Sequence, residues 1–339
     1  MSVNIRDVAR AAGVSVATVS KVMNGYTTVN ANTREKVLRI IEETQYQPNA
    51  AARSLVGQRS MTLGVFLTTG LSHPFFASVL SGIDEALKEK GYDLIYLAQA
   101  SSHRDYSIVR HCRTRHVEGV IVFGFQRDER DFEELIGSGI PAVFLDMDIA
   151  GPRLAVITSD NVEAMRAAVR HLRELGHERI AFIGGLPESL VGMQRHEGYR
   201  LGLRDGGLPY RPEYAADGDF GRASGARAMR GLLALPEPPT AVVCGSDMSA
   251  FGALDAAAEA GLSVPVDLSV VGFDDIEAAS VVRPALTTVR QDMPSMGRRA
   301  VELLDGMIRD ADFRPPAREV LPTELIVRGT TGRPAKPGS

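Results

Sequence analysis

The sequence predicts an α/β protein whose two-lobed body of doubly wound parallel sheets is preceded by a short all-α unit. Apolar residues recur at helical spacing near the N-terminus, and from residue 61 onward buried-strand patterns alternate with helical patterns. The alternation runs through two series, which predicts two parallel sheets covered by helices. A chain of 339 residues is long enough for two or three domains with a large buried core.

A predicted pair of short helices spans residues 5–24. The apolar face of the first helix is formed by Ile5, Val8, Ala9 and Ala12. Gly13 suits the left-handed turn that ends a helix, and Ser15 is a good N-cap for the next one. The apolar side of that second helix is formed by Val16, Val19, Val22 and Met23. The pattern is typical of a helix-turn-helix, whose second helix enters the DNA major groove, although spacing alone equally allows a hairpin that only packs.

The polar side of the second helix favours the DNA interpretation. It carries short hydrogen-bonding groups and one cation, the types that contact phosphates and base edges: Thr18, Ser20, Lys21 and Asn24. A third helix follows, with Asn30 as the predicted N-cap and an apolar face formed by Val37, Leu38, Ile40 and Ile41. Because a helix N-terminus attracts anions, Thr33 and Arg34 at its start are candidates for phosphate contact.

The body is predicted from short apolar runs that alternate with helical patterns. The predicted strands are Leu63–Leu67, Leu94–Leu97, Val120–Phe123, Ala142–Leu145, Val156–Ile157, Ile180–Ile183, Ala241–Cys244 and Val270–Phe273. Predicted helices include 76–87, stopped by Gly91, Val162–Leu175, stopped by Gly176, and Ser249–Ala260. Ligands of such folds bind at the carboxyl ends of the strands, which here predicts a site between the two lobes.

Candidate ligand contacts stand just past predicted strand ends. Asp146 and Asp274 each follow a strand, and Arg195 lies after the strand that ends at Ile183. Carboxylates accept hydrogen bonds from vicinal hydroxyls, and a guanidinium donates to ring or carboxylate oxygens. Phe75 and Phe220 are candidates to sandwich a flat or pyranose ring from opposite lobes, although Phe75 also fits a core position beside Phe76.

The charge distribution separates a basic N-terminus from an acidic body. Residues 1–60 contain eight Lys and Arg against four Asp and Glu, whereas the rest contains 30 against 38, for a net charge of -4. This split predicts that DNA contact is confined to the N-terminal unit. The two cysteines, Cys112 and Cys244, do not form a disulfide framework. No signal peptide or long apolar run is visible, so we expect a cytoplasmic protein without membrane contact.

Sequence motifs of enzymes are missing. The segment after Leu67 lacks the Gly-x-Gly-x-x-Gly of dinucleotide-binding folds, and the pair Gly184-Gly185 is isolated. No Walker loop or nucleophile-elbow sequence occurs, and His171 and His177 do not have the i, i+4 spacing of a helical zinc site. We therefore expect no catalytic residues, no cofactor and no metal centre.

The chain resembles the LacI/GalR (lactose-repressor) family over nearly all of residues 3–328. The matching stretches include Ile5–Asn24, Val29-Asn30, Thr33-Arg34, Tyr46–Ala50, Ala52–Leu55, Ser159–Asn161, Ser269–Asp275 and Pro284–Gln291. The resemblance implies a periplasmic-binding-protein-like body whose two lobes are connected by three crossovers. It implies a helix-turn-helix domain over 1–47, a hinge helix or linker over 48–59, and an effector-binding and dimerisation domain over 60–329.

The resemblance also implies the division of the body into lobes. The N-lobe takes residues 61–159 and about 290–320, and the C-lobe takes 160–288 and about 321–329. Residues 330–339 are expected to form a disordered tail because their composition is poor in apolar residues. The leucine-rich C-terminal heptads of tetrameric relatives are missing, so a homodimer is the simpler expectation.

The resemblance implies specific DNA contacts. Val16, Ala17 and Lys21 would face base edges, and the predicted phosphate contacts are Thr18, Ser20, Asn24 and Thr33. The hinge would add Asn49, Arg53 and Leu55, with Leu55 as a minor-groove wedge. The operator would be roughly palindromic because a dimer is two-fold symmetric.

The resemblance implies an effector site formed by Phe75, Asp146, Arg195, Phe220, Ser246 and Asp274. Ser246 stands where many members of the family have Asn, so recognition of hydroxyls can differ here. The predicted function is a ligand-responsive repressor whose effector is a sugar or a sugar derivative. The alternative is a cytoplasmic solute-binding receptor that uses the same body.

Overall fold

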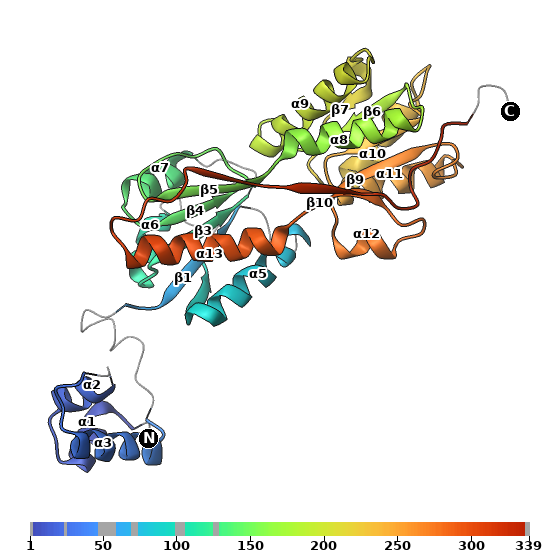
Figure 1. The fold of residues 1–339 in the computed structure, drawn as a ribbon. Helices are drawn as coiled ribbons and strands as arrows, with labels where there is room; N and C mark the ends of the chain where they lie inside the picture. The colour runs from blue at the N-terminus through green and yellow to red at the C-terminus, as the bar shows by residue number, and fades with distance from the viewer. Residues whose placement is uncertain are drawn as a thin grey trace. The chain divides into compact units, whose positions relative to one another are not determined.

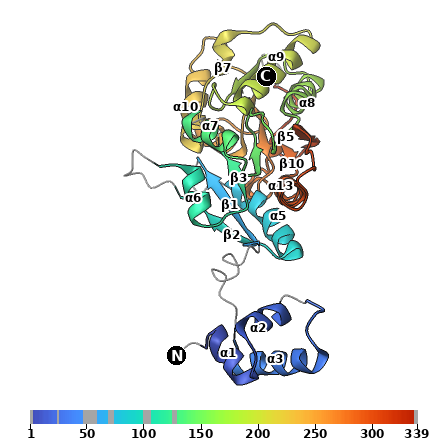
Figure 2. The ribbon, with the colours of Figure 1, turned by 90° about the vertical axis from the view of Figure 1, so that its left-hand side faces the viewer.

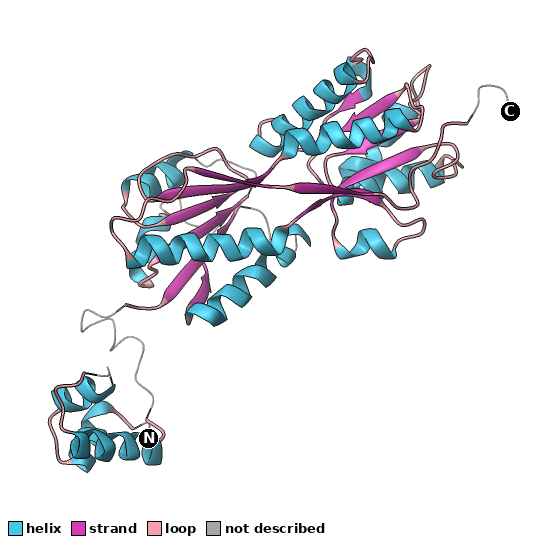
Figure 3. Ribbon diagram, in the orientation of Figure 1, coloured by secondary structure: helices cyan, strands magenta, loops and turns pink. Residues whose placement is uncertain are grey.

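The chain folds into two compact units, residues 1–60 and 61–339. The computed structural model describes residues 3–23, 26–46, 59–68, 74–98, 106–124 and 129–335. We call the first unit the N-terminal unit and the second the body. The α/β fold class predicted from the sequence is confirmed, since helices form the N-terminal unit and two sheets form the body (Figure 3).

The N-terminal unit contains three helices, α1 (Ile5–Ala12), α2 (Val16–Met23) and α3 (Ala31–Thr44). Its small core is formed by side chains from all three helices and the residue that closes the unit: Val8, Ala9, Ala12, Val19, Val22, Val37, Ile40 and Tyr46. The helices therefore cover one another through the apolar faces that the sequence spacing predicts, with Val16 and Leu38 as exceptions.

The first sheet of the body has the strand order β11-β5-β4-β3-β1-β2. Its strands are β1 (Thr62–Leu67), β2 (Asp93–Tyr96), β3 (Gly119–Phe123), β4 (Ala142–Leu145), β5 (Leu154–Ser159) and β11 (Arg318–Leu321), all parallel to their neighbours. Its helices are α5 (Pro74–Lys90), α6 (Ile108–Thr114), α7 (Glu129–Gly137) and α13 (Met293–Arg309). We call this sheet and its helices the first lobe (Figure 1).

The second sheet has the order β12-β10-β9-β8-β6-β7. Its strands are β6 (Ile180–Ile183), β7 (Ala215–Ala216), β8 (Ala241–Cys244), β9 (Ser269–Asp274), β10 (Thr287–Gln291) and the antiparallel β12 (Thr323–Ile326). Its helices are α8 (Asn161–Glu174), α9 (Leu190–Asp205), the short η1 (Pro212–Tyr214), α10 (Arg222–Leu233), α11 (Asp247–Glu259) and α12 (Glu277–Val281). We call this group the second lobe.

Alternation of side chains along the strands divides the core of each lobe into two layers. In the first lobe, Leu63 and Val65 pack with α5 and α13, while Phe66 faces the opposite layer with α6 and α7 (Figure 2). In the second lobe, Phe182 packs with α8 and α9, and Ile183 packs with α10 and α11. Helices on both faces of each sheet are the doubly wound arrangement that the βα alternation predicts.

The described chain passes between the two sheets three times, after β5, after β10 and between β11 and β12. The boundary expected at about residue 290 falls inside β10, where Arg290 pairs with Asp274 of β9. The second sheet therefore keeps the chain through Gln291, and the first lobe resumes only afterwards. In the part of the chain that is described, no helix is long and apolar enough to cross a membrane.

Residues 330–335 correct the expectation of a disordered tail that begins at residue 330. Thr330 is fully buried, and its hydroxyl accepts from the Thr287 backbone N–H at 2.8 Å and donates to the Val270 carbonyl at 2.7 Å. The buried His177 ring has its Nε2 2.9 Å from the Gly332 carbonyl oxygen. Backbone hydrogen bonds and buried hydroxyls thus hold this polar segment, which composition alone cannot reveal. Residues 336–339 lie outside the described ranges.

Candidate DNA-binding and effector sites

Helix caps orient α1 and α2 in the N-terminal unit. The Asn4 side chain accepts from the backbone N–H groups of Arg6 and Asp7, and Asp7 returns a bond to the Asn4 N–H at 3.1 Å. Gly13 ends α1 with a φ of 67°, which confirms the predicted left-handed turn. Ser15 Oγ then accepts from the Thr18 N–H at 3.2 Å, so Ser15 caps α2 as predicted. These caps define the turn between the two helices.

The predicted base-facing side chains lie on the exposed side of α2. Val16 is 40% exposed, whereas Val19 on the opposite side is fully buried. Ala17 and Lys21 are exposed, and Thr18, Ser20 and Thr33 are partly exposed. Thr33 lies in the first turn of α3, which Asn30 caps by accepting from the Asn32 N–H at 2.9 Å. Asn24, Asn49, Arg53 and Leu55 lie outside the described residues.

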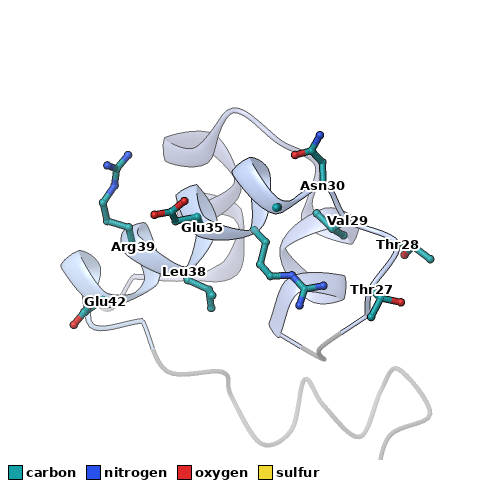
Figure 4. A pocket seen from close by; sticks show the side chains of 10 residues that line it. Thr27, Thr28, Val29, Asn30, Glu35, Leu38, Arg39 and Glu42 are labelled. Carbon is teal, nitrogen blue, oxygen red and sulfur yellow. The ribbon is translucent and has the colours of Figure 1, made fainter.

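An open groove of about 1150 Å³ runs along α3 and the loop before it (Figure 4). Leu38 lines this groove and is 49% exposed, so its expected place in the core is wrong. The reason is angular: Leu38 is one helical step past Val37, and the core face continues through Ile40 and Ile41 instead. The α3 apolar face is therefore narrower than its sequence suggests.

Arg195 is the central cation of the candidate effector site in the second lobe. Its Nε donates to Asn161 Oδ1 at 2.8 Å and its Nη1 donates to the Gly245 carbonyl at 2.6 Å. Its guanidinium carbon lies 3.7 Å from the centre of the Phe273 ring. Asp274 Oδ1 is 3.9 Å from Nη1, and both side chains are almost fully buried. The structure therefore brings Arg195 and Asp274 together, and the guanidinium is held on several sides.

Asp146 joins this group from the first lobe. It follows β4, is 3% exposed, and its Oδ1 accepts from the Thr158 hydroxyl at 2.7 Å. Its charge interacts with those of Arg195 and Asp274. Parallel strands end at one edge of a sheet, so the carboxyl ends of β4 and β9 present these acids from the two lobes.

Left-handed backbone conformations gather at the same strand ends. They occur at Asp146 (φ 59°), Phe220 (φ 66°), Asp274 (φ 120°) and Asp275 (φ 58°). Non-glycine residues rarely adopt such values, and they concentrate at functional sites where the surrounding structure holds them. This backbone geometry supports a ligand site at the strand ends independently of the side-chain chemistry.

Burial shapes the electrostatics of the site. Desolvation raises the pKa of Asp274 to about 7, against the opposing effects of Arg195 and the Gln291 hydrogen bond. Desolvation also raises the pKa of Asp146 and that of Asp247, whose carboxylate accepts from the Ile276 N–H and the Thr288 hydroxyl. Burial lowers the pKa of Arg195, while the three aspartates raise it. The site thus holds three buried acids around one guanidinium.

The pKa of Asp274 predicts a pH-dependent contribution to stability. A raised folded-state pKa means that the folded chain binds the proton more tightly, so this contribution is lost as the pH rises from about 4 through about 7. Asp274→Asn should remove the loss, and its melting temperature relative to the wild type should rise between pH 5 and pH 8. The exposed Asp312→Asn is the matched control. An Asp274→Asn difference that is constant with pH would contradict the assignment.

Phe75 and Ser246 do not have the surroundings expected of ligand contacts. Phe75 is 4% exposed and stacks on Phe123 with 5.1 Å between ring centres, so it lies in the core of the first lobe. Ser246 caps α11: its hydroxyl donates to the Phe220 carbonyl at 2.7 Å and accepts from the Ser249 N–H at 3.0 Å. Its oxygen also lies 2.9 Å from Ser249 Oγ, which uses the remaining capacity of one hydroxyl.

Phe220 packs beside Arg195, as expected for a wall of the site. The Arg195 guanidinium carbon lies 5.7 Å from the centre of its ring. The ring is 2% exposed and rests on Gly185, where a Cβ would lie 1.9 Å from Phe220 Cζ. Glycine at position 185 is therefore required for this placement of the ring.

Two further polar residues belong to the group and were not assigned from the sequence. Asn161, the first residue of α8, accepts from Arg195 and donates to Gln194 Oε1 at 3.1 Å. Gln291, the last residue of β10, donates to Asp274 Oδ1 at 2.7 Å, and its buried Oε1 has no partner. Both stand at the end of a strand or just past one, and that position was the signal available in the sequence.

Metal binding finds no support in the described ranges. The His, Cys, Asp and Glu residues there form no group of three or more that could hold a metal ion. Cys112 and Cys244 are both buried, and burial raises the pKa of the Cys112 thiol to about 12. Neither thiol has the electropositive, accessible surroundings of a reactive cysteine.

Comparison with known families matches both parts of the chain. Residues 4–49 match the family described as bacterial regulatory proteins, lacI family. Residues 169–331 match the periplasmic binding protein-like domain. The two matches fall on the helical N-terminal unit and on the body.

Individual relatives align along almost the whole chain. The probable HTH-type transcriptional repressor ExuR of Bacillus subtilis (strain 168) is 35% identical over 98% of this chain and 99% of its own length. Catabolite control protein A of Priestia megaterium is 37% identical over 90% of this chain and 92% of its own.

Solved structures show the same architecture. The Lac repressor dimer bound to operator and the anti-inducer ONPF has a TM-score of 0.83 and is 31% identical, covering 98% of this chain and 100% of its own. A complex of the transcriptional regulator CelR with cellobiose has a TM-score of 0.74 and is 33% identical, covering 97% of this chain and 99% of its own.

Proposed function

Because the chain belongs to the LacI family of bacterial DNA-binding regulators, we propose that it is a cytoplasmic, homodimeric repressor whose operator affinity is controlled by a small molecule. The observation that carries the proposal is the combination, on one chain, of a capped helix-turn-helix and a two-lobed body with buried charges at its strand ends. The proposed effector is a sugar or sugar derivative bound between the lobes.

The proposed reading surface is the exposed side of α2. Val16, Ala17 and Lys21 would face base edges, and Thr18, Ser20 and Thr33 would contact phosphates. Val16 and Ala17 can touch a thymine methyl group but cannot hydrogen-bond a base, so Lys21 would carry more of the discrimination. Asn24, Asn49, Arg53 and Leu55 complete the proposal from the family resemblance, with Leu55 as the minor-groove wedge.

The proposed control couples the effector site to the operator. Asp146 and Thr158 stand in the first lobe, whereas Arg195, Phe220 and Asp274 stand in the second. A ligand that bridges the two groups favours one angle between the lobes. In a two-fold dimer this angle sets the separation of the paired hinge segments, and with it the affinity for a roughly palindromic operator.

A gel-shift with the DNA upstream of the protein's own gene tests the proposal. Specific binding is expected for a repressor, whereas the alternative, a solute-binding receptor with the same body, would bind this DNA no better than a scrambled sequence. The test uses the full chain and needs no knowledge of the effector.

Lys21→Ala identifies the surface that reads the DNA. We expect it to weaken specific binding by about 1–3 kcal/mol at fixed salt, more than it weakens binding to scrambled DNA. Arg39→Ala removes an exposed cation of the same unit from α3 and is the matched control. Equal losses for the two variants on specific DNA would show that Lys21 acts only through charge.

A further inference from the structure

We propose that the effector is an uncharged ligand rich in hydroxyl groups, and that this site rejects ligands carrying a carboxylate or a phosphate. The inference rests on the effector site proposed above and narrows its ligand class. It follows from the charges and hydrogen-bonding groups that the structure places at the ends of β4, β9 and β10.

Negative charge exceeds positive charge in this group. Asp146, Asp247 and Asp274 are 3%, 0% and 5% exposed, and they surround the single guanidinium of Arg195. The nearby cations Arg290 and Arg328 each lie 2.7 Å from a carboxylate oxygen of Asp275. These two arginines are therefore neutralised by a fourth acid. An anionic ligand would enter against the remaining excess, and such repulsion is strong where water is excluded.

Arg195 is also poorly placed to hold an anion. Asn161 Oδ1 and the Gly245 carbonyl occupy its Nε and Nη1, at 2.8 and 2.6 Å. Phe273 covers one face of the guanidinium at 3.7 Å, and Phe220 lies 5.7 Å away. The two-pronged grip that arginine uses for carboxylates and phosphates needs neighbouring N–H groups that are free to donate together.

Acceptors, in contrast, remain open. Gln291 is 2% exposed, and its Oε1 has no partner while its Nε2 is held by Asp274. Oδ1 of Asp146 accepts from Thr158, and a carboxylate has about four acceptor positions. A ligand that complements these oxygens supplies O–H donors. Hydroxyl groups bound to the ionised carboxylates would lower the pKa of Asp146 and Asp274, whereas a second anion would raise it further.

Matched ligands test the charge class on the full-length protein. D-glucose, D-galactose and cellobiose are compared in thermal-shift titrations with glucuronate, galacturonate and glucose 6-phosphate at equal ionic strength. Saturable stabilisation is expected only from a neutral member, and Asp274→Ala should remove it. Saturable binding of an acid or phosphate that Asp274→Ala abolishes would overturn the charge inference while leaving the proposed site in place. Binding of a neutral sugar that is unaffected by Asp274→Ala would instead remove the proposed site.

A second arm needs no effector. If the acids are in excess, Asp146→Asn should raise the melting temperature at pH 8, and inorganic phosphate should stabilise the wild type no more than chloride of equal ionic strength. Asp148→Asn, two residues away on the surface and paired with Arg318, is the control and should not raise it. A lower melting temperature for Asp146→Asn, or saturable stabilisation by phosphate, would overturn the inference because either result would show compensated charge.

Discussion

Arg195→Met is expected to lower the free energy of unfolding of the body by about 3–5 kcal/mol, because it leaves buried acids without their cation. Arg195 is 4% exposed and faces Asp146, Asp247 and Asp274. The substitution also removes the donors that satisfy Asn161 Oδ1 and the Gly245 carbonyl. Methionine keeps much of the length of the side chain, so the effect reports charge and hydrogen bonds more than lost volume.

Denaturant unfolding of the full chain measures this effect, and the same helix offers a control. Arg200→Met removes an exposed arginine from α9 whose partner is Glu197 at 3.1 Å, and its cost should stay within about 1 kcal/mol. Asp274→Asn should restore part of the stability lost in Arg195→Met because it removes one uncompensated acid. Equal costs at positions 195 and 200, without rescue, would show that Arg195 does not balance buried charge.

Gly82→Ala is expected to destabilise the first lobe by about 1–3 kcal/mol, because α5 and α13 touch through their backbones at this point. A Cβ at position 82 would lie 1.8 Å from the Pro294 carbonyl oxygen. The contact is reciprocal, since a Cβ at Gly297 would lie 2.1 Å from the Val79 carbonyl oxygen. A backbone atom cannot rotate away as a side chain can, so the two helices must separate.

Gly231→Ala is the matched control for Gly82→Ala. Gly231 lies inside α10, and a Cβ there meets no atom within 4 Å. Alanine at this position should stabilise the chain by up to about 1 kcal/mol through helix propensity alone. Thermal unfolding of the two variants should therefore shift in opposite directions. A shift of the same sign and size would mean that the α5–α13 contact tolerates an added methyl group.

Local signals were sufficient for the elements of the chain. Gly13, Ser15 and Asn30 mark helix ends as predicted because a cap depends on residues within one turn of itself. The predicted strands and helices of the body are present, with ends that differ by a few residues. Short strands such as β7 and the edge strands β11 and β12 were not predicted, since their partly exposed residues lack a continuous apolar run.

Environments of single side chains could not be predicted in the same way. Phe75 and Phe220 are similar in sequence, yet Phe75 stacks on Phe123 in the core while Phe220 lies against Arg195. Ser246 follows a strand end like a ligand contact, but its hydroxyl is occupied by the α11 cap. These outcomes depend on partners that are distant in the sequence.

By itself the sequence determined the order of helices and strands, the basic N-terminal unit and the acidic body, because periodicity, caps and charge are properties of neighbouring residues. Only the tertiary structure decided that Asp146, Arg195 and Asp274 form one buried group with Asn161 and Gln291. It also decided that residues 330–335 pack on the second lobe. Burial and hydrogen-bond geometry arise when strand ends from different parts of the chain meet, and no local pattern contains them.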